Sequence, residues 1–174
     1  MDEQQFWELI AAARSQVIDP VESGTVALKA TSLPAARPVV EIVAAQQVLW
    51  DLVAESCTNP LWAAAYFING GCSEDGFDHF RGWLIAGGRE AFERVVADPD
   101  ALAQLPIVQA SAADGVDLEG EDMLGIAWNA HLRVQPVASR SCGRLGRAGR
   151  RRSHACGVAG RHGRNGGRCA GRGR

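Results

Sequence analysis

Residues 59–83 read NPLWAAAYFINGGCSEDGFDHFRGW and predict two helices joined by a tight turn. Asn59-Pro60 marks a helix start, because asparagine caps free backbone N–H groups and proline fits the first helical turn. Gly70-Gly71 marks the end of that helix, since glycine adopts the left-handed conformation without a Cβ clash. Ser73 is a capping residue for the next helix, and acidic residues follow it where the helix dipole favours negative charge.

The two predicted helices differ in their apolar pattern. Residues 61–68 are apolar on every side, which is typical of a helix at the centre of a domain. The second helix places Phe77, Phe80 and Leu84 at helical spacing, and Trp83 widens that stripe. We therefore expect the first helix to be buried all round and the second to bury one face.

Helical patterns continue on both sides of this stretch. Further helices are expected over residues 3–14, 38–56, 89–97 and 121–132, with a short turn over 100–105. Residues 16–37 are expected to be a connection with at most one short element, and the segment before residue 121 is expected to be a loop. No segment shows sustained alternation with period two. The sequence predicts an all-α fold, a compact bundle of about five to six short helices ending near residue 133.

The charge is divided unevenly along the chain. Residues 1–132 contain 20 acidic and 6 basic side chains, a net charge of −14, whereas residues 133–174 contain 12 arginines and no acidic residue. The total of −2 therefore describes neither an acidic domain over residues 1–133 nor a basic tail over residues 134–174. Such an acidic domain repels phosphates, which argues against nucleic-acid binding by the domain and suits a basic protein partner.

No membrane segment is expected. The longest unbroken apolar run, residues 61–68, has eight residues, and a transmembrane helix needs about 20. The chain starts Met1-Asp2-Glu3, which is acidic where a secretory signal is basic and then apolar. These features predict a soluble, cytoplasmic protein.

The tail over residues 134–174 is expected to be disordered. From residue 133 onward the chain has 10 glycines, no aromatic residue and one leucine, so it cannot bury enough apolar surface to offset the entropy of ordering. One hypothesis is an arm that binds nucleic-acid phosphates through arginine, although no aromatic side chain is present for base stacking. A second hypothesis is a zinc site, against which the absence of a Cys-x-x-Cys pair argues. Its ligands would come from Cys142, His154, Cys156, His162 and Cys169.

A third hypothesis is that the tail is translated out of frame. The chain has one lysine and 17 arginines, a bias expected of a GC-rich gene. A shifted frame in such a gene produces mainly Arg, Gly, Ala and Cys, which is the composition of this tail. A solvated tail without a role is the remaining alternative, and the coding DNA around codon 133 tests the out-of-frame hypothesis.

The turn and helix over residues 69–83 concentrate the side chains that carry chemistry. Asp75, Asp78 and His79 are candidate metal ligands, because Asp75 and His79 are four residues apart and share one helix face. The alternative, which we favour, is that the carboxylates stabilise the positive end of the helix dipole while His79 lies on the solvated side. The spacing does not match a calcium-binding loop.

Cys72 is a candidate nucleophile. A position just before a helix N-terminus lowers a thiol pKa and favours the thiolate. A general base is also needed, and His79 and His131 are the only histidines before the tail. The alternative is an unreactive, partly buried cysteine, which is the commoner case.

Arg81 lies between Phe80 and Trp83 and completes the candidate set of Cys72, Asp78, His79 and Arg81. An arginine among aromatic side chains could bind an anionic ligand. It could equally pair with Asp78 one turn back and fasten the helix to the acidic domain, which is the interpretation we favour.

The quoted residues resemble a known family. The block from Trp62 to Glu93, with its NGGCSEDGFDHFRGW core, and the opening Phe6-Trp7-x-Leu9-Ile10 are similar to the bacterial family called domain of unknown function 4240. The resemblance covers residues 1 to about 133. It implies a small helical domain with no assigned activity, cofactor or partner. The Arg/Gly tail departs from the family pattern, which continues with acidic and aromatic residues.

Three functions follow from these patterns. The leading one is a non-catalytic interaction domain, because the sequence is helical and strongly acidic and lacks a convincing catalytic set. A basic protein partner would suit this charge. The alternative is an enzyme or metal-binding domain centred on residues 69–83. The third is nucleic-acid binding through the tail. No cofactor is expected.

Overall fold

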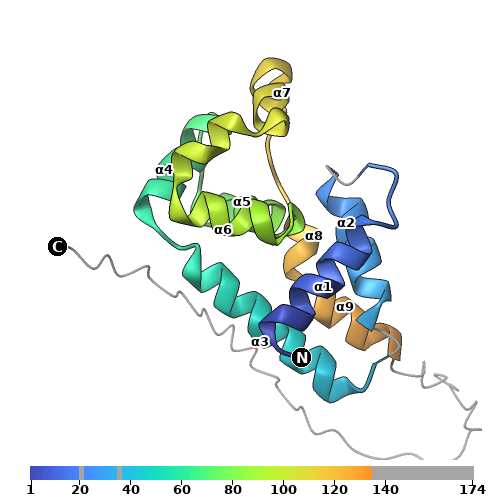
Figure 1. The fold of residues 1–174 in the computed structure, drawn as a ribbon. Helices are drawn as coiled ribbons and strands as arrows, with labels where there is room; N and C mark the ends of the chain where they lie inside the picture. The colour runs from blue at the N-terminus through green and yellow to red at the C-terminus, as the bar shows by residue number, and fades with distance from the viewer. Residues whose placement is uncertain (20–21, 35–36, 135–174) are drawn as a thin grey trace, which may run out of the picture.

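The computed structural model describes residues 1–19, 22–34 and 37–134 (Figure 1). These residues form ten helical segments and no β-strand. The segments are α1 (Glu3–Arg14), α2 (Ser23–Ser32), α3 (Val39–Glu55), α4 (Asn59–Ile68), α5 (Glu74–Ala86), α6 (Arg89–Ala97), the 3₁₀ helix η2 (Pro99–Gln104), α7 (Pro106–Asp114), α8 (Glu121–Leu124) and α9 (Ile126–Val134). The predicted all-α class is confirmed. Residues 135–174 lie outside the described residues, and with them the predictions made for the tail.

Local sequence signals account for the first turns of the best-defined helices. In α1, the Asp2 carboxylate accepts a hydrogen bond from the Gln5 backbone, and the Gln5 side chain accepts one from the Asp2 backbone. This capping box satisfies two N–H groups that a helix N-terminus otherwise leaves unbonded. In α5, the Ser73 hydroxyl accepts from Gly76 N at 3.0 Å, as the sequence predicts.

The core is centred on α5. Its Phe77, Phe80 and Leu84 side chains are buried, as their spacing predicts, and they join Phe6 of α1 and Phe92 of α6 in one cluster. Helix α5 packs against α2, α3, α4, α6 and α8. In Figure 1 it lies between α4 and α7 at one end of the domain and α1, α2 and α9 at the other.

The expectation that residues 61–68 form a fully buried central helix is wrong. Helix α4 buries Leu61 and Ala65, while Tyr66 and Phe67 are 54% and 83% exposed. The helix packs through one side only, on α5, η2 and α7. An apolar sequence on every side therefore does not require burial on every side. The cap is also one residue earlier than expected, because Thr58 accepts the hydrogen bond from Leu61 N.

Two further differences concern the C-terminal half. The segment expected to be a loop before residue 121 contains α7, which begins at Pro106. Only Val108 and Ser111 of α7 are buried, so it has no apolar stripe that a spacing argument could detect. The single helix expected over residues 121–132 is divided into α8 and α9 at Gly125.

Candidate functional site

The turn between α4 and α5 is built by backbone hydrogen bonds. Gly70 and Gly71 have φ angles of +65° and +148°, and Gly71 N donates to the Tyr66 carbonyl at 2.9 Å. Both positive angles suit glycine, as the sequence predicts. The Trp62 indole N–H donates to the Cys72 carbonyl at 3.2 Å, and its ring stacks on Phe77 with the centroids 5.0 Å apart. The turn is therefore held by α4 as well as by the cap of α5.

The segment between α7 and α8 crosses directly over this turn and over α5. The Asn69 side chain bonds both peptide groups of Leu118, accepting from its N at 3.1 Å and donating to its O at 3.3 Å. Gly120 N donates to the His79 carbonyl at 2.9 Å. A Cβ on Gly82 would lie 2.3 Å from the Gly120 carbonyl oxygen. The segment between α7 and α8 thus packs on the turn and on α5.

Sequence reasoning treated the density of polar residues here as a sign of chemistry. It missed Asn69, Gly82 and Gly120, because their partners are 38 to 49 positions away in the chain. Gly82, inside α5, was the available signal, since a glycine inside a helix often marks a close approach of another backbone segment.

Arg81 contacts protein groups in the way that its structural interpretation predicts. Its side chain is 7% exposed, forms an ion pair with Asp78, and donates to the Val53 carbonyl of α3. Its guanidinium lies over the Phe77 ring, 4.5 Å from the centroid, in a cation–π contact. Asp78 is 40% exposed and supplies the counter-charge. Arg81 therefore links α5 to the C-terminal part of α3.

Cys72 is a free, partly buried thiol whose Sγ donates to the Ser73 carbonyl at 3.6 Å. Burial raises the pKa of this thiol, because the charged thiolate is desolvated. Arg81 acts in the opposite direction, and the nearby carboxylate of Glu119 raises the pKa further. The net shift is therefore opposite in direction to the lowering on which the nucleophile hypothesis for Cys72 depends, and that hypothesis stays a prediction.

The other candidates are distributed around α5. Asp75 is exposed and His79 is half-buried. His131 lies on α9, where it lines a groove against α3 and not the turn that contains Cys72. Across residues 1–19, 22–34 and 37–134, no group of three or more His, Cys, Asp or Glu side chains is arranged to hold a metal ion. The structure thus brings Asp78 and Arg81 into contact, with Cys72 near the Arg81 charge.

Exposed aromatic and acidic side chains lie on the three segments that meet at this turn. Tyr66 and Phe67 lie in the last turn of α4 with their rings in edge-to-face contact, 6.3 Å between centroids. Asn69 holds Leu118, on whose two sides exposed carboxylates lie. We call this set the acidic–aromatic surface, and it consists of Tyr66, Phe67, Glu74, Asp75, Asp117 and Glu119.

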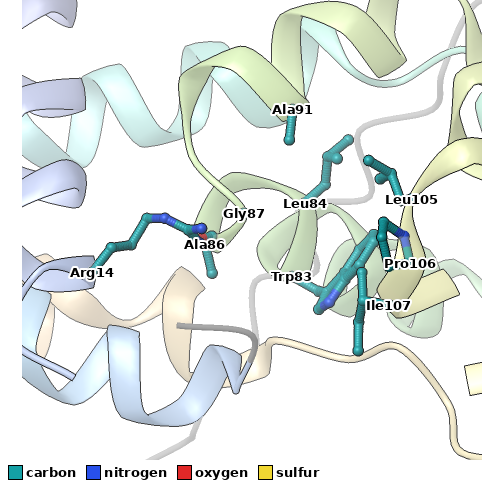
Figure 2. A pocket seen from close by; sticks show the side chains of 9 residues that line it. All are labelled: Arg14, Trp83, Leu84, Ala86, Gly87, Ala91, Leu105, Pro106 and Ile107. Atoms are coloured by element: carbon teal, nitrogen blue, oxygen red, sulfur yellow. The ribbon is translucent and has the colours of Figure 1, made fainter. Parts of the chain in front are cut away.

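Three cavities lie elsewhere in the described part of the chain. The first, of about 200 Å³, lies between Arg14 of α1, the end of α5 and the η2–α7 connection (Figure 2). The second, of about 330 Å³, lies between α2 and α9, and the third, of about 250 Å³, between α3 and α9. None was predictable from spacing, because each is lined by segments distant in sequence. The third has apolar rims, with Val43 63% and Trp128 62% exposed.

Comparisons with known proteins give one match. The family model described as protein of unknown function (DUF4240) matches residues 1–133. No curated protein and no solved structure matches the chain. Among the described helices, none combines the length and the apolar character needed to cross a membrane. The family match covers most of the chain and confirms the resemblance seen in the sequence. The chain therefore belongs to the DUF4240 family of proteins of unknown function.

Proposed function

We propose that this domain is a non-catalytic interaction module that binds a basic protein segment through the acidic–aromatic surface. The observation that carries the proposal is the exposure of Phe67, which is 83% accessible and lies two residues before Asn69, the side chain that binds Leu118 between the exposed Asp117 and Glu119. Exposing a large aromatic side chain to water is unfavourable, and aromatic residues are enriched at the energetic centres of protein interfaces.

The charge of the surface specifies the chemistry of the partner. Glu74 and Asp75 start α5, and Asp117 and Glu119 flank the anchored Leu118. Arginine and lysine side chains pair with such carboxylates, and they stack on exposed Tyr and Phe rings by cation–π contacts. The net charge of −14 over residues 1–132 adds long-range attraction and accelerates association with a basic segment.

The rigidity of the surface also supports a binding role. The Asn69 bonds to Leu118 and the Trp62 bond to the Cys72 carbonyl hold both halves of the surface before any partner arrives. A surface organised in advance loses less conformational entropy on binding. Burial raises the pKa of the Cys72 thiol, which supports a binding role over a thiolate nucleophile.

The test is a titration of the full chain with a short peptide that alternates arginine with aliphatic residues, followed by calorimetry. We expect the double variant Asp117→Asn, Glu119→Gln to weaken binding by about tenfold or more at low salt. The matched control is Asp51→Asn, Glu55→Gln, which removes the same charge from exposed positions of α3. It should change the affinity by about twofold or less.

A second pair of variants tests the aromatic part. Phe67→Ala should weaken binding, and Trp50→Ala, at a half-exposed position of α3, should not. Every comparison uses the whole chain, so the arginines of residues 135–174 contribute equally to each variant. Equal losses of affinity in the two double variants would show attraction by net charge alone. If the unsubstituted chain does not bind the peptide, the proposal is refuted.

A further inference from the structure

The second cavity, between α2 and α9, is lined by polar as well as apolar side chains. Its volume is about 330 Å³. Helix α2 packs on both α8 and α9, and all three helices contribute to the lining (Figure 1). The polar residues that line it are Thr31, Asp122, Asn129 and Arg133. The cavity therefore brings together a hydroxyl, a carboxylate, an amide and a guanidinium group from different helices.

The apolar wall of this cavity comes from one side of α2 and one side of α9. The residues of α2 that line it recur three and four positions apart, so they share one face of the helix over about 10 Å. Ala27 is buried, whereas Leu28 and Leu132 are 57% and 52% exposed. An aliphatic ligand that covered the two leucines would remove their apolar surface from water, which is favourable.

The two charged groups of the cavity lie on different helices and do not pair with each other. Asp122 belongs to α8, and its carboxylate lies against the first turn of α2, where a Cβ on Gly24 would be 3.7 Å from Oδ2. Arg133 belongs to the last turn of α9. Within residues 1–19, 22–34 and 37–134, the ion pairs involve neither of these side chains. Both charges are therefore available to a ligand.

The helices that form the cavity are fixed in the structure. The Ser23 hydroxyl at the start of α2 donates to the Glu119 carbonyl at 2.6 Å, which ties α2 to the segment before α8. Met123 of α8 and Ile126 of α9 are buried in the core. A site that is organised in advance loses less conformational entropy when a ligand binds.

We propose that this cavity binds a small zwitterion with an aliphatic chain between its two charges, the chemistry of an ω-amino acid. The amino group of the ligand would bind the Asp122 carboxylate, and the carboxylate of the ligand would bind the Arg133 guanidinium. The aliphatic chain would lie against Leu28 and Leu132. An apolar wall with a few converging polar groups is typical of sites for small ligands.

Other ligand classes fit less well. An anion without an amino group meets the Asp122 carboxylate, and a cation without a carboxylate meets the Arg133 guanidinium, so each experiences repulsion from one like charge. An aromatic ligand finds no stacking partner, because the described residues that line the cavity include no aromatic side chain.

A purely structural role of the two charges is the alternative. Asp122 lies beside the positive end of α2, and Arg133 lies at the negative end of α9, so both suit the helix dipoles. Such a role affects the stability of the helices and predicts no preference for a zwitterion over a ligand with one charge. Selective binding therefore separates the two explanations.

The probes are ε-aminocaproate, caproate and hexylamine, titrated into the full chain and followed by NMR. They share a six-carbon chain and carry both charges, only the carboxylate or only the ammonium group. The methyl signals of Leu28 and Leu132 should shift with ε-aminocaproate at about millimolar concentration, and each of the other probes should bind about tenfold more weakly. Equal binding of ε-aminocaproate and either other probe, or no shift of these signals, would overturn the proposal.

Two variants at exposed positions assign each charge of the ligand to its partner. Asp122→Asn should weaken ε-aminocaproate binding about tenfold and make it no stronger than caproate binding, because the amino group loses its partner. Arg133→Gln should make ε-aminocaproate binding no stronger than hexylamine binding, because the carboxylate loses its partner. An unchanged affinity for ε-aminocaproate in either variant would overturn the proposal.

The controls remove the same charges at positions that do not line the cavity. They are Glu121→Gln, beside Asp122 in α8, and Arg37→Gln, which removes an exposed arginine that pairs with Glu41. Each should change the affinity for ε-aminocaproate by about twofold or less. The binding of a basic segment to the acidic–aromatic surface depends on other residues, so either result leaves that proposal intact.

Discussion

Asn69 is the single side chain that most directly links the two halves of the candidate site. Its side-chain amide forms two hydrogen bonds with the backbone of Leu118, one to the N–H group and one to the carbonyl. Asn69→Ala should lower the free energy of unfolding by about 2 kcal/mol, because each lost bond contributes about 1 kcal/mol. Urea denaturation measures this change.

The control for that substitution is another amide that forms only an exposed bond. Gln47 donates to Asp51 one turn along α3 at 2.9 Å. Gln47→Ala should change the free energy of unfolding by less than about 0.5 kcal/mol. If both alanine variants have the same stability, the crossing segment is not held by Asn69.

Cys72 provides a test at the same scale that depends on pH. Because burial and Glu119 raise the pKa of this thiol, its alkylation by iodoacetamide should increase only at a higher pH than that of the urea-unfolded chain. Glu119→Gln should move the reaction towards lower pH, since the carboxylate favours the neutral thiol. Mass spectrometry of the Cys72 peptide follows this residue separately from the others.

The raised pKa of Cys72 makes the stability of the fold depend on pH in a definite direction. The folded state holds the Cys72 proton more tightly than the unfolded state, so this group adds stability below the unfolded pKa and loses it as pH rises through the folded pKa. A reaction profile for Cys72 that begins below that of the unfolded chain would contradict the assignment and restore the nucleophile hypothesis.

At the scale of the element, α5 carries two glycines whose substitution should differ greatly in its effect on stability. Gly82→Ala should prevent normal folding or cost several kcal/mol, because its Cβ would lie 2.3 Å from the backbone oxygen of Gly120. Gly76→Ala, in the first turn of α5, meets the Ser73 hydroxyl at 3.3 Å and the Cys72 Sγ at 3.9 Å, so it should change the stability by less than about 1 kcal/mol. Thermal unfolding of the two variants measures the difference, and similar melting temperatures would show that the close contact is not maintained.

The elements also show which sequence signals are dependable. The starts of α1 and α5 were predictable because Asp2 and Ser73 act on residues three positions away. Burial of α4 was not, since an apolar sequence cannot report which side finds a packing partner. Helix α7 was missed for the opposite reason, because it buries too little to show helical periodicity.

For the whole molecule, we propose that residues 1–133 form the folded domain and that residues 134–174 are a separate basic segment. Trypsin should remove the arginine-rich segment first and leave a fragment that ends near residue 133, because only seven Lys and Arg residues occur before Val134. Intact-mass analysis over time measures the fragment. Early cleavage at Arg14, Lys29 or Arg81 would count against the domain boundary.

The coding DNA tests the origin of that segment. The family match ends at residue 133, where the composition changes, so we propose that the reading frame shifts there. An alternative frame after codon 133 should encode an amphipathic continuation that contains acidic residues. If neither alternative frame does, the frameshift hypothesis fails and a nucleic-acid-binding arm becomes the better explanation of the tail.

Helical class, most helix starts, the main core stripe and the family were determined by the sequence alone. These properties depend on interactions within one or two helical turns, such as the caps at Asp2 and Ser73 and the spacing of Phe77, Phe80 and Leu84. The pairing of Asp78 with Arg81 was predictable for the same reason.

Only the tertiary structure decided what the residues around the turn do. The bonds from Asn69 to Leu118, the contact between Gly82 and Gly120, the raised pKa of Cys72 and the cavity at Arg14 all join residues far apart in the chain. Burial and long-range contact depend on which faces of separate helices meet. No local spacing rule contains that information, because it is set by the packing of the whole domain.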